Sequence, residues 1–347
     1  MRITAILCVK NEGAFLLEWL AHHKGIGVTD VVVLSNDCDD GTDAMLDRLD
    51  EMGEIAHIRN DGPYDQGGIQ FTGLKRADKH PLVKDADWLV VLDIDEFVNV
   101  HVGDRTLPAL VGALPDADAI TLTWRMFGNA GIVRYRDVPV TQEFTRAAPA
   151  VMLWPWRAFL FKTLYRNTGA YAKLGVHRPR APKEGADSTR WFDGCGRELA
   201  PRFRRQGIFS AFNQPNYDLV QLNHYALGAM ESYLLKRDRG RVNRGEDLMG
   251  MDYWCERNWS DEDDPSILKA THLSQPILSR FHADPTLSSL HQTAVTWRTK
   301  RYETLMKDEA CRALMGRLMM TPPAQPLQPH IAAELLKHTQ IQGGGRD

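Results

Sequence analysis

The stretch LVVLDIDEF, residues Leu89–Phe97, runs from apolar residues into three closely spaced carboxylates. Neighbouring carboxylates repel one another unless a cation lies between them. Side chains alternate between the two faces of a strand, so Asp93 and Asp95 are predicted to point the same way and Ile94 into the core. Two carboxylates on one face, just past a buried strand, favour a divalent cation that holds a diphosphate. The alternative is that these residues are solvated at a strand end, or that Glu96 caps the next helix.

Upstream and around this stretch, strand-like and helix-like patterns alternate. The predicted strands are ITAILCV (3–9), DVVVLS (30–35), EIAHIR (54–59) and DWLVVLD (87–93). The predicted helices, each with an apolar stripe at helical spacing, are EGAFLLEWLAHHKGIG (12–27), TDAMLDRLDEMG (42–53) and IQFTGLKRADKH (69–80). This rhythm indicates βαβ units, and therefore an α/β fold with a mostly parallel central sheet flanked by helices.

The second half of the chain has a looser pattern. Strands are predicted at DAITLTWRMFG (118–128), RAFLFKTLYR (157–166) and DLVQLNHYA (218–226), and helices at MESYLLKRDRGRV (230–242) and across 285–320. Loops rich in arginine, proline and aromatic residues separate the strands. We therefore expect an α/β domain over 1–240, a helical extension over 241–320 and a loosely ordered tail over 321–347.

Composition excludes several classes of function. The formal net charge of −3 provides no basic surplus for the phosphates of a nucleic acid, so no nucleic-acid partner is expected. The five cysteines are scattered without a CxxC spacing, which argues against a disulfide framework and fits a reducing compartment. The apolar run Ile3–Val9 is too short for a signal peptide, and no stretch approaches the length of a membrane span. The sequence therefore predicts a cytoplasmic protein.

Polar segments follow three of the predicted strands: KNE (10–12), SNDCDDGT (35–42) and DIDEF (93–97). Ligands of open α/β sheets bind beyond the carboxyl ends of the strands, so these segments are expected to meet in one cleft. In the second segment, Asn36, Asp37 and Asp39 offer groups for a ribose or a base edge, or form a turn that caps the following helix. Lys75 is a candidate phosphate contact, with a solvated basic helix face as the alternative.

Histidine is the commonest nitrogen ligand that could join the two aspartates around a metal. His224 ends the strand-like run QLNHYA, and His177 follows the strand FKTLYR. A hydrogen-bonded core histidine is the alternative for His224. His22 and His23 lie on a predicted helix and are expected to serve packing.

Three segments together resemble the family 2-like glycosyltransferases of GT-A fold. These are ILCVKNEGAFLLEWLAHHKGIGVTDVVVLSNDCDDGT, ADWLVVLDIDEF and NHYALGAMESYLLKRDRGRVN. The combination is most similar to a bacterial branch related to the family 92 galactosyltransferases, and it covers about residues 3–240. The resemblance implies a nucleotide-binding half over 1–100 and an acceptor-facing half over 101–240. It also implies a nucleoside-diphosphate sugar donor, with a UDP-sugar favoured, and a glycan or lipid-linked hydroxyl acceptor.

The resemblance further implies roles for individual residues. Asp95 would bind Mn²⁺ or Mg²⁺ directly, and Asp93 would hold the metal, the ribose or both. The nucleotide pocket would contain the residues after the first two strands, namely Asn11, Glu12, Asn36, Asp37 and Asp39. His224 would complete the coordination of the metal or the diphosphate, with His177 and Glu96 as secondary candidates.

An inverting single displacement needs a carboxylate base to take the proton of the acceptor hydroxyl. The sequence has no persuasive counterpart of the E-D pair that such enzymes carry after the D-x-D. Asp193 in WFDG and Asp218 in NYDLV are the candidates, because EDDP (262–265) comes too late in the chain. Trp154, Trp156 and Trp191 are candidates for stacking on a sugar ring, with core packing as the alternative.

Three other functions predict different sequence features. A haloacid-dehalogenase-type phosphatase would carry its aspartates after the first strand, and a sugar-nucleotide pyrophosphorylase would carry a glycine-rich loop there. A non-catalytic binding protein, degenerate in the transferase reaction, remains the main alternative because no base is evident. A lipid-linked acceptor would allow the basic segment 236–244 to meet a membrane surface, at most as a peripheral contact.

Overall fold

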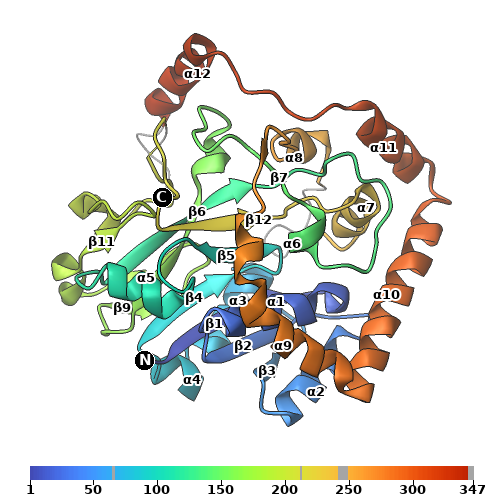
Figure 1. Cartoon of the computed structure of the whole chain (residues 1–347), viewed down its shortest axis with the longest axis horizontal. Coiled ribbons are helices and arrows are strands. Elements are labelled where there is room, and N and C mark those ends of the chain that lie inside the picture. The colour runs from blue at the N-terminus through green and yellow to red at the C-terminus, as the bar shows by residue number, and fades with distance from the viewer. Residues whose placement is uncertain (65–66, 212, 241–248, 343–347) are drawn as a thin grey trace.

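A computed structural model describes residues 1–64, 67–211, 213–240 and 249–342. Its centre is a mixed sheet with the strand order β3-β2-β1-β4-β8-β6-β12-β5, and β11 pairs with β6 beside this path (Figure 1). The pairs β1–β2, β1–β4, β2–β3, β6–β12 and β6–β11 are parallel. The pairs β4–β8, β6–β8 and β5–β12 are antiparallel. The predicted α/β architecture with a mostly parallel sheet is confirmed.

The sheet strands lie close to the predicted runs. They are β1 (Ile3–Val9), β2 (Asp30–Ser35), β3 (Ala56–Arg59), β4 (Trp88–Leu92), β5 (Glu96–Val100), β6 (Ala119–Met126), β8 (Phe161–Arg166), β11 (Trp191–Phe192) and β12 (Val220–His224). Two small ribbons accompany the sheet, formed by β7 (Arg146–Ala147) with β13 (Glu262–Asp263) and by β9 (Tyr171–Lys173) with β10 (Arg180–Pro182). The sequence pattern did not predict β5, which follows β4 after three residues and returns antiparallel to β12.

Helices cover both faces of the sheet, which explains why β1 is a continuous apolar run rather than an alternating one. Leu7 and Val9 belong to one core cluster, which also contains apolar side chains of α1 (Gly13–Gly25), α2 (Thr42–Glu51), α9 (Thr271–Ala283) and α10 (Pro285–Leu305). Ile6 and Cys8 point to the other cluster, which contains side chains of α3 (Gly68–Ala77) and α4 (Pro81–Lys84). Each face of the parallel part of the sheet therefore has its own core.

The remaining helices are short or lie toward the C-terminal end. They are α5 (Leu107–Ala113), α6 (Val140–Glu143), α7 (Met230–Asp238), α8 (Met251–Cys255), α11 (Glu309–Met320) and α12 (Pro329–Gln342). Among the described residues, no helix is both long enough and apolar enough to cross a bilayer.

The C-terminal segments differ from the predicted extension and tail. Helix α9 packs against α1, and α10 packs against α1, α2 and α7, so both helices belong to the layer that covers the sheet (Figure 1). Helix α12 occupies a stretch that was expected to be loosely ordered. Its sequence PHIAAELLKHTQIQ starts with proline at the first helical position and continues with strong helix formers, and the neighbouring proline-rich and glycine-rich stretches masked that signal.

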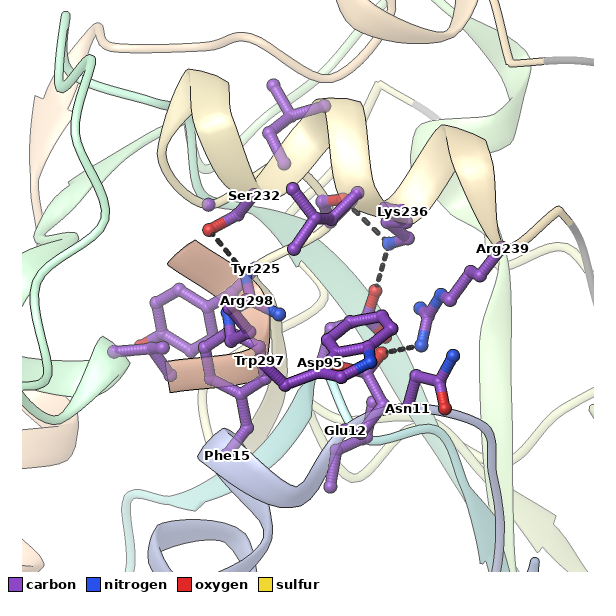
Figure 2. A pocket seen from close by; sticks show the side chains of 16 residues that line it. Asn11, Glu12, Phe15, Asp95, Tyr225, Ser232, Lys236, Arg239, Trp297 and Arg298 are labelled. Carbon is purple, nitrogen blue, oxygen red and sulfur yellow. Dashed lines mark hydrogen bonds and ion pairs between the residues drawn. The ribbon is translucent and has the colours of Figure 1, made fainter. Parts of the chain in front are cut away.

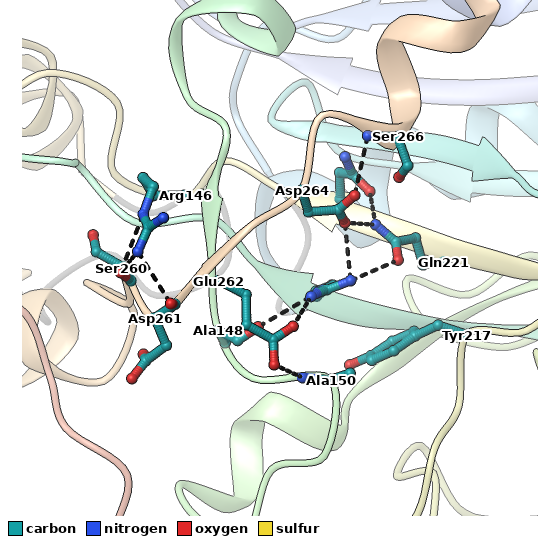
Figure 3. A network of polar contacts seen from close by, with 12 residues as sticks. Arg146, Ala148, Ala150, Tyr217, Gln221, Ser260, Asp261, Glu262, Asp264 and Ser266 are labelled. Atoms are coloured by element: carbon teal, nitrogen blue, oxygen red, sulfur yellow. Dashed lines mark hydrogen bonds and ion pairs between the residues drawn. The ribbon is translucent and has the colours of Figure 1, made fainter.

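A polar network fixes the segment around β13 to the sheet (Figure 3). Arg125 of β6 donates to Asp264 at 2.9 Å and to Glu262 at 2.6 Å. Gln221 of β12 donates to the same Asp264 oxygen at 2.7 Å. Arg125 and Gln221 lie on the opposite sheet face from Trp124 and His224, because side chains alternate along each strand. The network therefore holds the segment around β13 against the sheet face opposite to the one that carries Trp124 and His224.

The buried imidazole of His22 makes the stability of the fold depend on pH. Its Nε2 lies 2.8 Å from the carbonyl oxygen of Val98, and burial lowers the pKa of His22 to about 4. The unfolded chain therefore binds a proton that the native chain does not between pH 6.5 and pH 4, so stability falls as pH falls through this window. We expect His22 alone to cost about 2 kcal/mol of unfolding free energy between pH 7 and pH 5.

Urea unfolding at pH 7 and pH 5 measures this effect. His22→Gln should lose about this share of the pH dependence, whereas His272→Gln, at an exposed position, should keep the dependence of the parent. Equal pH dependence in the parent and in His22→Gln would contradict the assignment.

Candidate active site

A cleft of about 250 Å³ opens at the carboxyl ends of β1, β4, β6 and β12. Lys10 and Glu12 line it at the end of β1, Asp93 and Asp95 at the end of β4, and His224 at the end of β12. The convergence of the first and fourth strand ends follows the rule for open α/β sheets. A second, more enclosed cavity adjoins the cleft at Glu12 and Asp95 (Figure 2).

Asp93 and Asp95 lie in a turn, not on a strand. Strand β4 ends at Leu92 and β5 starts at Glu96, so the chain reverses across the D-x-D residues. The indole Nε1 of Trp19 holds this turn by donating to the carbonyl oxygens of Asp93 at 3.1 Å and Glu96 at 3.0 Å. The prediction that the two carboxylates share one strand face is therefore wrong. They line one cleft but have different partners.

Asp93 is held by a lysine from beneath the cleft. Its carboxylate accepts hydrogen bonds from Lys162 Nζ at 2.9 Å and from Gln70 Nε2 at 3.3 Å. Lys162 is fully buried and also lies 3.4 Å from Glu96, whose carboxylate accepts the indole N–H of Trp124 at 2.6 Å. Glu96 thus belongs to the support under the turn. The only sequence signal for Lys162 was a lysine within the apolar strand FLFKTLY.

Asp95 contacts two groups from the second half of the chain. Lys236 Nζ of α7 donates to its Oδ2 at 2.5 Å, and Nε2 of His224 lies 3.7 Å from the same oxygen. Burial opposes ionisation of Asp95, but Lys236 and His224 hold its pKa well below the usual range. Burial lowers the pKa of His224, so its imidazole is neutral at pH 7. An ionised carboxylate and a neutral imidazole are the protonation states in which these groups bind metals.

The donor set fits a divalent cation only if a ligand completes it. Among the described residues, no group of three or more histidine, cysteine, aspartate and glutamate side chains is arranged around a metal position. Asp95 and His224 would supply two ligands, and buried Nδ1 of His224 has no hydrogen-bond partner in the described structure. Mg²⁺ in nucleotide enzymes is commonly held by one or two carboxylates together with substrate phosphates. The pair therefore fits a metal that binds with a diphosphate, provided that Lys236 releases Asp95.

Lys236 of α7 and Arg239, which caps the C-terminal end of this helix, face the cleft and pair with carboxylates from the first half of the chain (Figure 2). Lys236 pairs with Asp95, and Arg239, three residues later on the same helix face, pairs with Glu12 and also donates to the carbonyl oxygen of Lys10 at 2.8 Å. These two side chains are therefore directed into the cleft, in contrast to the expected membrane-facing segment 236–244. Residues 241–248 of that segment lie outside the described residues.

The residues predicted to bind the nucleoside lie in the loops that follow β1 and β2. Asn11 lines the more enclosed cavity and accepts the backbone N–H of Asp39 at 2.7 Å. Asn36 is buried and donates to the carbonyl oxygen of Val9 at 2.9 Å, and Asp37 accepts the hydroxyl of Tyr64. Asn36, Asp37 and Asp39 are absent from the described lining of the cleft, and their contacts shape the loop beside it.

Two further candidates lie outside the described lining of the cleft. Lys75 is exposed on α3. His177 is half-buried, with Nδ1 3.0 Å from the carbonyl oxygen of Phe161 and its ring 5.7 Å from that of Trp124. Trp124 itself lines the cleft, as does Tyr253, and its ring lies 4.2 Å from that of His224. The sequence interpretation missed both aromatic residues.

The two predicted base residues lie at the edge of the sheet opposite to the one that carries His224. Asp193 follows β11, which pairs with the first residues of β6, and its carboxylate binds Arg197 Nε at 2.7 Å. Asp218 is exposed and precedes β12, whose length alone separates it from His224 by about 13 Å. The structure does not bring either carboxylate to the cleft, so their assignment as the base receives no geometric support.

The tryptophans expected to stack on a sugar do not gather in the cleft. Trp191 is buried in the core cluster that also contains Phe203, and Trp154 is half-buried. Neither belongs to the described cleft lining, and the side chain of Trp156 lies outside the described part of the chain.

Sequence comparison finds relatives that match part of the chain. A segment of 143 residues is 24% identical to a family 92 glycosyltransferase protein of Oryza sativa subsp. japonica, covering 40% of this chain and 23% of that protein. The chain is a distant relative of the family 92 glycosyltransferases. A family 92 protein of Ricinus communis is 24% identical over 148 residues, covering 39% of this chain and 24% of that protein. The match thus spans less than a quarter of each relative, and no family model matches the chain.

Solved structures similar to this chain include two bacterial proteins. Staphylococcus aureus TarS aligns with a TM-score of 0.30 and 19% identity, covering 48% of this chain and 47% of that one. Glucosyl-3-phosphoglycerate synthase from Mycobacterium tuberculosis, solved with Mn²⁺ and UDP, aligns with a TM-score of 0.26 and 21% identity, covering 36% of this chain and 44% of that one.

Proposed function

We propose that the protein is a glycosyltransferase that moves a sugar from a nucleoside-diphosphate donor, UDP-sugar foremost, to a hydroxyl of a glycan or lipid-linked acceptor. One observation carries the proposal. The D-x-D turn meets Lys236 of α7 and the C-capping Arg239 in one cleft at the strand ends, where carboxylates and cations can together hold a metal–diphosphate group. The relation to family 92 supports the same reaction class.

Asp95 and His224 would hold the Mn²⁺ or Mg²⁺ ion that the resemblance implies. When bound, the ion would supply positive charge next to the leaving diphosphate. Lys236, displaced from Asp95, and Arg239, displaced from Glu12, would then pair with phosphate oxygens instead of carboxylates. Asp93, fixed by Lys162 and Gln70, would accept hydrogen bonds from ribose hydroxyls.

We also propose that the displacement is a single inverting step, as the sequence resemblance implies. The proposal leaves the base unassigned, since Asp193 and Asp218 lie away from the cleft. Proton NMR of the newly formed glycosidic bond would test the configuration once the acceptor is known.

Calorimetric titration of UDP, with and without Mn²⁺, tests the donor site. We expect Arg239→Gln to weaken UDP binding about 10- to 100-fold, because it removes a charge-assisted phosphate contact. Arg301→Gln is the matched control, since this half-buried arginine of α10 pairs with Asp238 of α7 and is absent from the described cleft lining. Equal losses in both variants, or no UDP binding by folded parent protein, would contradict the proposed site.

The non-catalytic alternative binds the donor without turnover. An assay of UDP-sugar hydrolysis distinguishes this alternative from a transferase. Transferases with a complete site hydrolyse their donor slowly when water replaces the acceptor. Mn²⁺-dependent release of UDP from a panel of UDP-sugars would support the enzyme. Binding of the panel without any release would favour the alternative.

A further inference from the structure

A cluster of two arginines and one glutamate, here called the arginine wall, lies at the end of the cleft near β6 and β12. It consists of Arg157, Glu256 and Arg257. Arg157 comes from the turn of 3₁₀-helix before β8, and the other two residues directly follow α8. Arg157 donates to both carboxylate oxygens of Glu256, at 3.2 and 2.9 Å, and Arg257 contacts the same carboxylate at 3.1 Å. One carboxylate is thus bound by two guanidinium groups.

Arg257 is rigidly held and retains hydrogen-bonding capacity. Its residue is 5% exposed and lines the cleft, and its guanidinium carbon lies 3.7 Å from the centre of the Tyr253 ring. Its buried Nε has no hydrogen-bond partner among the described residues. A buried guanidinium that is stacked on an aromatic ring is pre-organised for a carboxylate or a phosphate.

The arginine wall lies away from the expected nucleotide end. The strand order places β1 and β4 first along the sheet and β6 and β12 beyond them. Cys8, Lys10 and Gln70 line the cleft at the β1 end, whereas Trp124, His224 and Arg257 line it at the β6 and β12 end. A donor whose nucleoside occupies the β1 end and whose diphosphate lies at Asp95 leaves the arginine wall to the acceptor side.

The charges of the cleft leave room for one more anion. Its lining includes five basic side chains, Lys10, Arg157, Lys236, Arg239 and Arg257, and three acidic ones, Glu12, Asp93 and Asp95. Glu256, which binds both arginines of the wall, adds a fourth carboxylate, so a surplus of one positive charge remains. A nucleoside-diphosphate sugar carries two negative charges, which its divalent ion balances. The cleft would therefore keep a net positive charge after the donor has bound. This charge attracts a further anionic group.

We propose that the acceptor of this enzyme carries an acidic group, a phosphate or a carboxylate, and that Arg257 and Arg157 bind it. This inference rests on the proposed function, because it assigns the acceptor of that reaction. The acidic group docks against the arginine wall and so places the acceptor hydroxyl beside the sugar. Neutral glycans would lack this contact and be poorer acceptors.

Binding of a small phosphate-bearing alcohol tests the inference. Glycerol 3-phosphate and, as its neutral counterpart, glycerol are titrated into the full chain loaded with UDP and Mn²⁺, followed by calorimetry. We expect glycerol 3-phosphate to bind and glycerol not to bind. Arg257→Gln and Arg157→Gln should each weaken glycerol 3-phosphate at least 10-fold and leave UDP affinity within 2-fold. Arg190→Gln, at an exposed ion pair with Asp116 and Glu198, should change neither.

The outcomes of these titrations distinguish a wrong acceptor assignment from a wrong proposed function. Lack of UDP binding by the parent would reject the proposed donor site and, with it, the acceptor assignment. Normal UDP binding without binding of glycerol 3-phosphate, or with equal binding in Arg257→Gln, would overturn the inference alone. Loss of UDP affinity in Arg257→Gln would assign the arginine wall to the donor and also overturn it. Arg257→Lys, which keeps the charge, should retain part of the affinity and shows that the loss is not one of folding.

Discussion

Asp95→Asn is expected to lower kcat/KM for sugar transfer by about 10³-fold, the largest effect of any single substitution in the cleft. Asn is isosteric but neutral, so it weakens the metal ligand set and leaves Lys236 and His224 without the carboxylate that both contact. The loss should appear as a missing Mn²⁺ dependence of UDP binding, measured by calorimetry, and as absent UDP release from UDP-sugars. The fold should persist, because Asp95 lies in a turn at the cleft surface.

Asp116→Asn provides the control, because Asp116 is an exposed carboxylate paired with Arg190 and absent from the described cleft lining. It should leave turnover and Mn²⁺ dependence unchanged. Retention of Mn²⁺-dependent UDP binding in Asp95→Asn would show that the metal, if one binds, is held elsewhere, and would overturn the assignment of Asp95.

Lys162→Met is expected to destabilise the protein by about 3–5 kcal/mol, the range for removing one partner of a buried ion pair. Lys162 and Glu96 are fully buried, and Lys162 is the only lysine or arginine that pairs with Glu96 within the described part of the chain. Methionine has a similar volume, so the cost comes from the uncompensated carboxylate and not from a cavity. Urea unfolding followed by circular dichroism measures the difference.

Two further variants sharpen this prediction. Lys24→Met removes a less buried lysine from its pair with Glu54 and should cost only about 1 kcal/mol. In Lys162→Met/Glu96→Gln the buried negative charge is also removed, so the double variant should recover part of the stability lost in the single one. Equal costs for Lys162→Met and Lys24→Met would contradict the role of Lys162 as the buried counter-ion of the turn.

The parts of the fold that the sequence predicted are those encoded locally. The strands at 3–9, 30–35 and 87–93 were predictable because parallel strands buried on both faces are continuous apolar runs. The position of Asp95 at the cleft followed from the rule that ligands bind beyond strand ends. The sequence did not predict the orientation of the two aspartates. It depends on where β4 ends, because side chains in the following turn no longer alternate between the two faces of the sheet.

The missed features depend on pairings between distant segments. Asp193 could not be placed from its own neighbourhood, since its position depends on the pairing of β11 with the start of β6. Lys236 and Arg239 read as a basic surface because their partners, Asp95 and Glu12, precede them by more than 140 residues. Lys162 carried the one available signal, a charge in an apolar strand, and buried charges require a partner.

The packing of α9 and α10 on α1 and α2 has a consequence for how the chain folds during synthesis. The first strands and helices are made early, but α1 and α2 are covered by side chains such as Phe281 and Leu287, which are translated more than 200 residues later. Contacts of such long sequence separation slow folding, and the apolar sides of α1 and α2 stay uncovered until they form. Truncation at residue 240 should accordingly give an aggregating fragment, and co-expression of 241–347 in trans would be the way to rescue it.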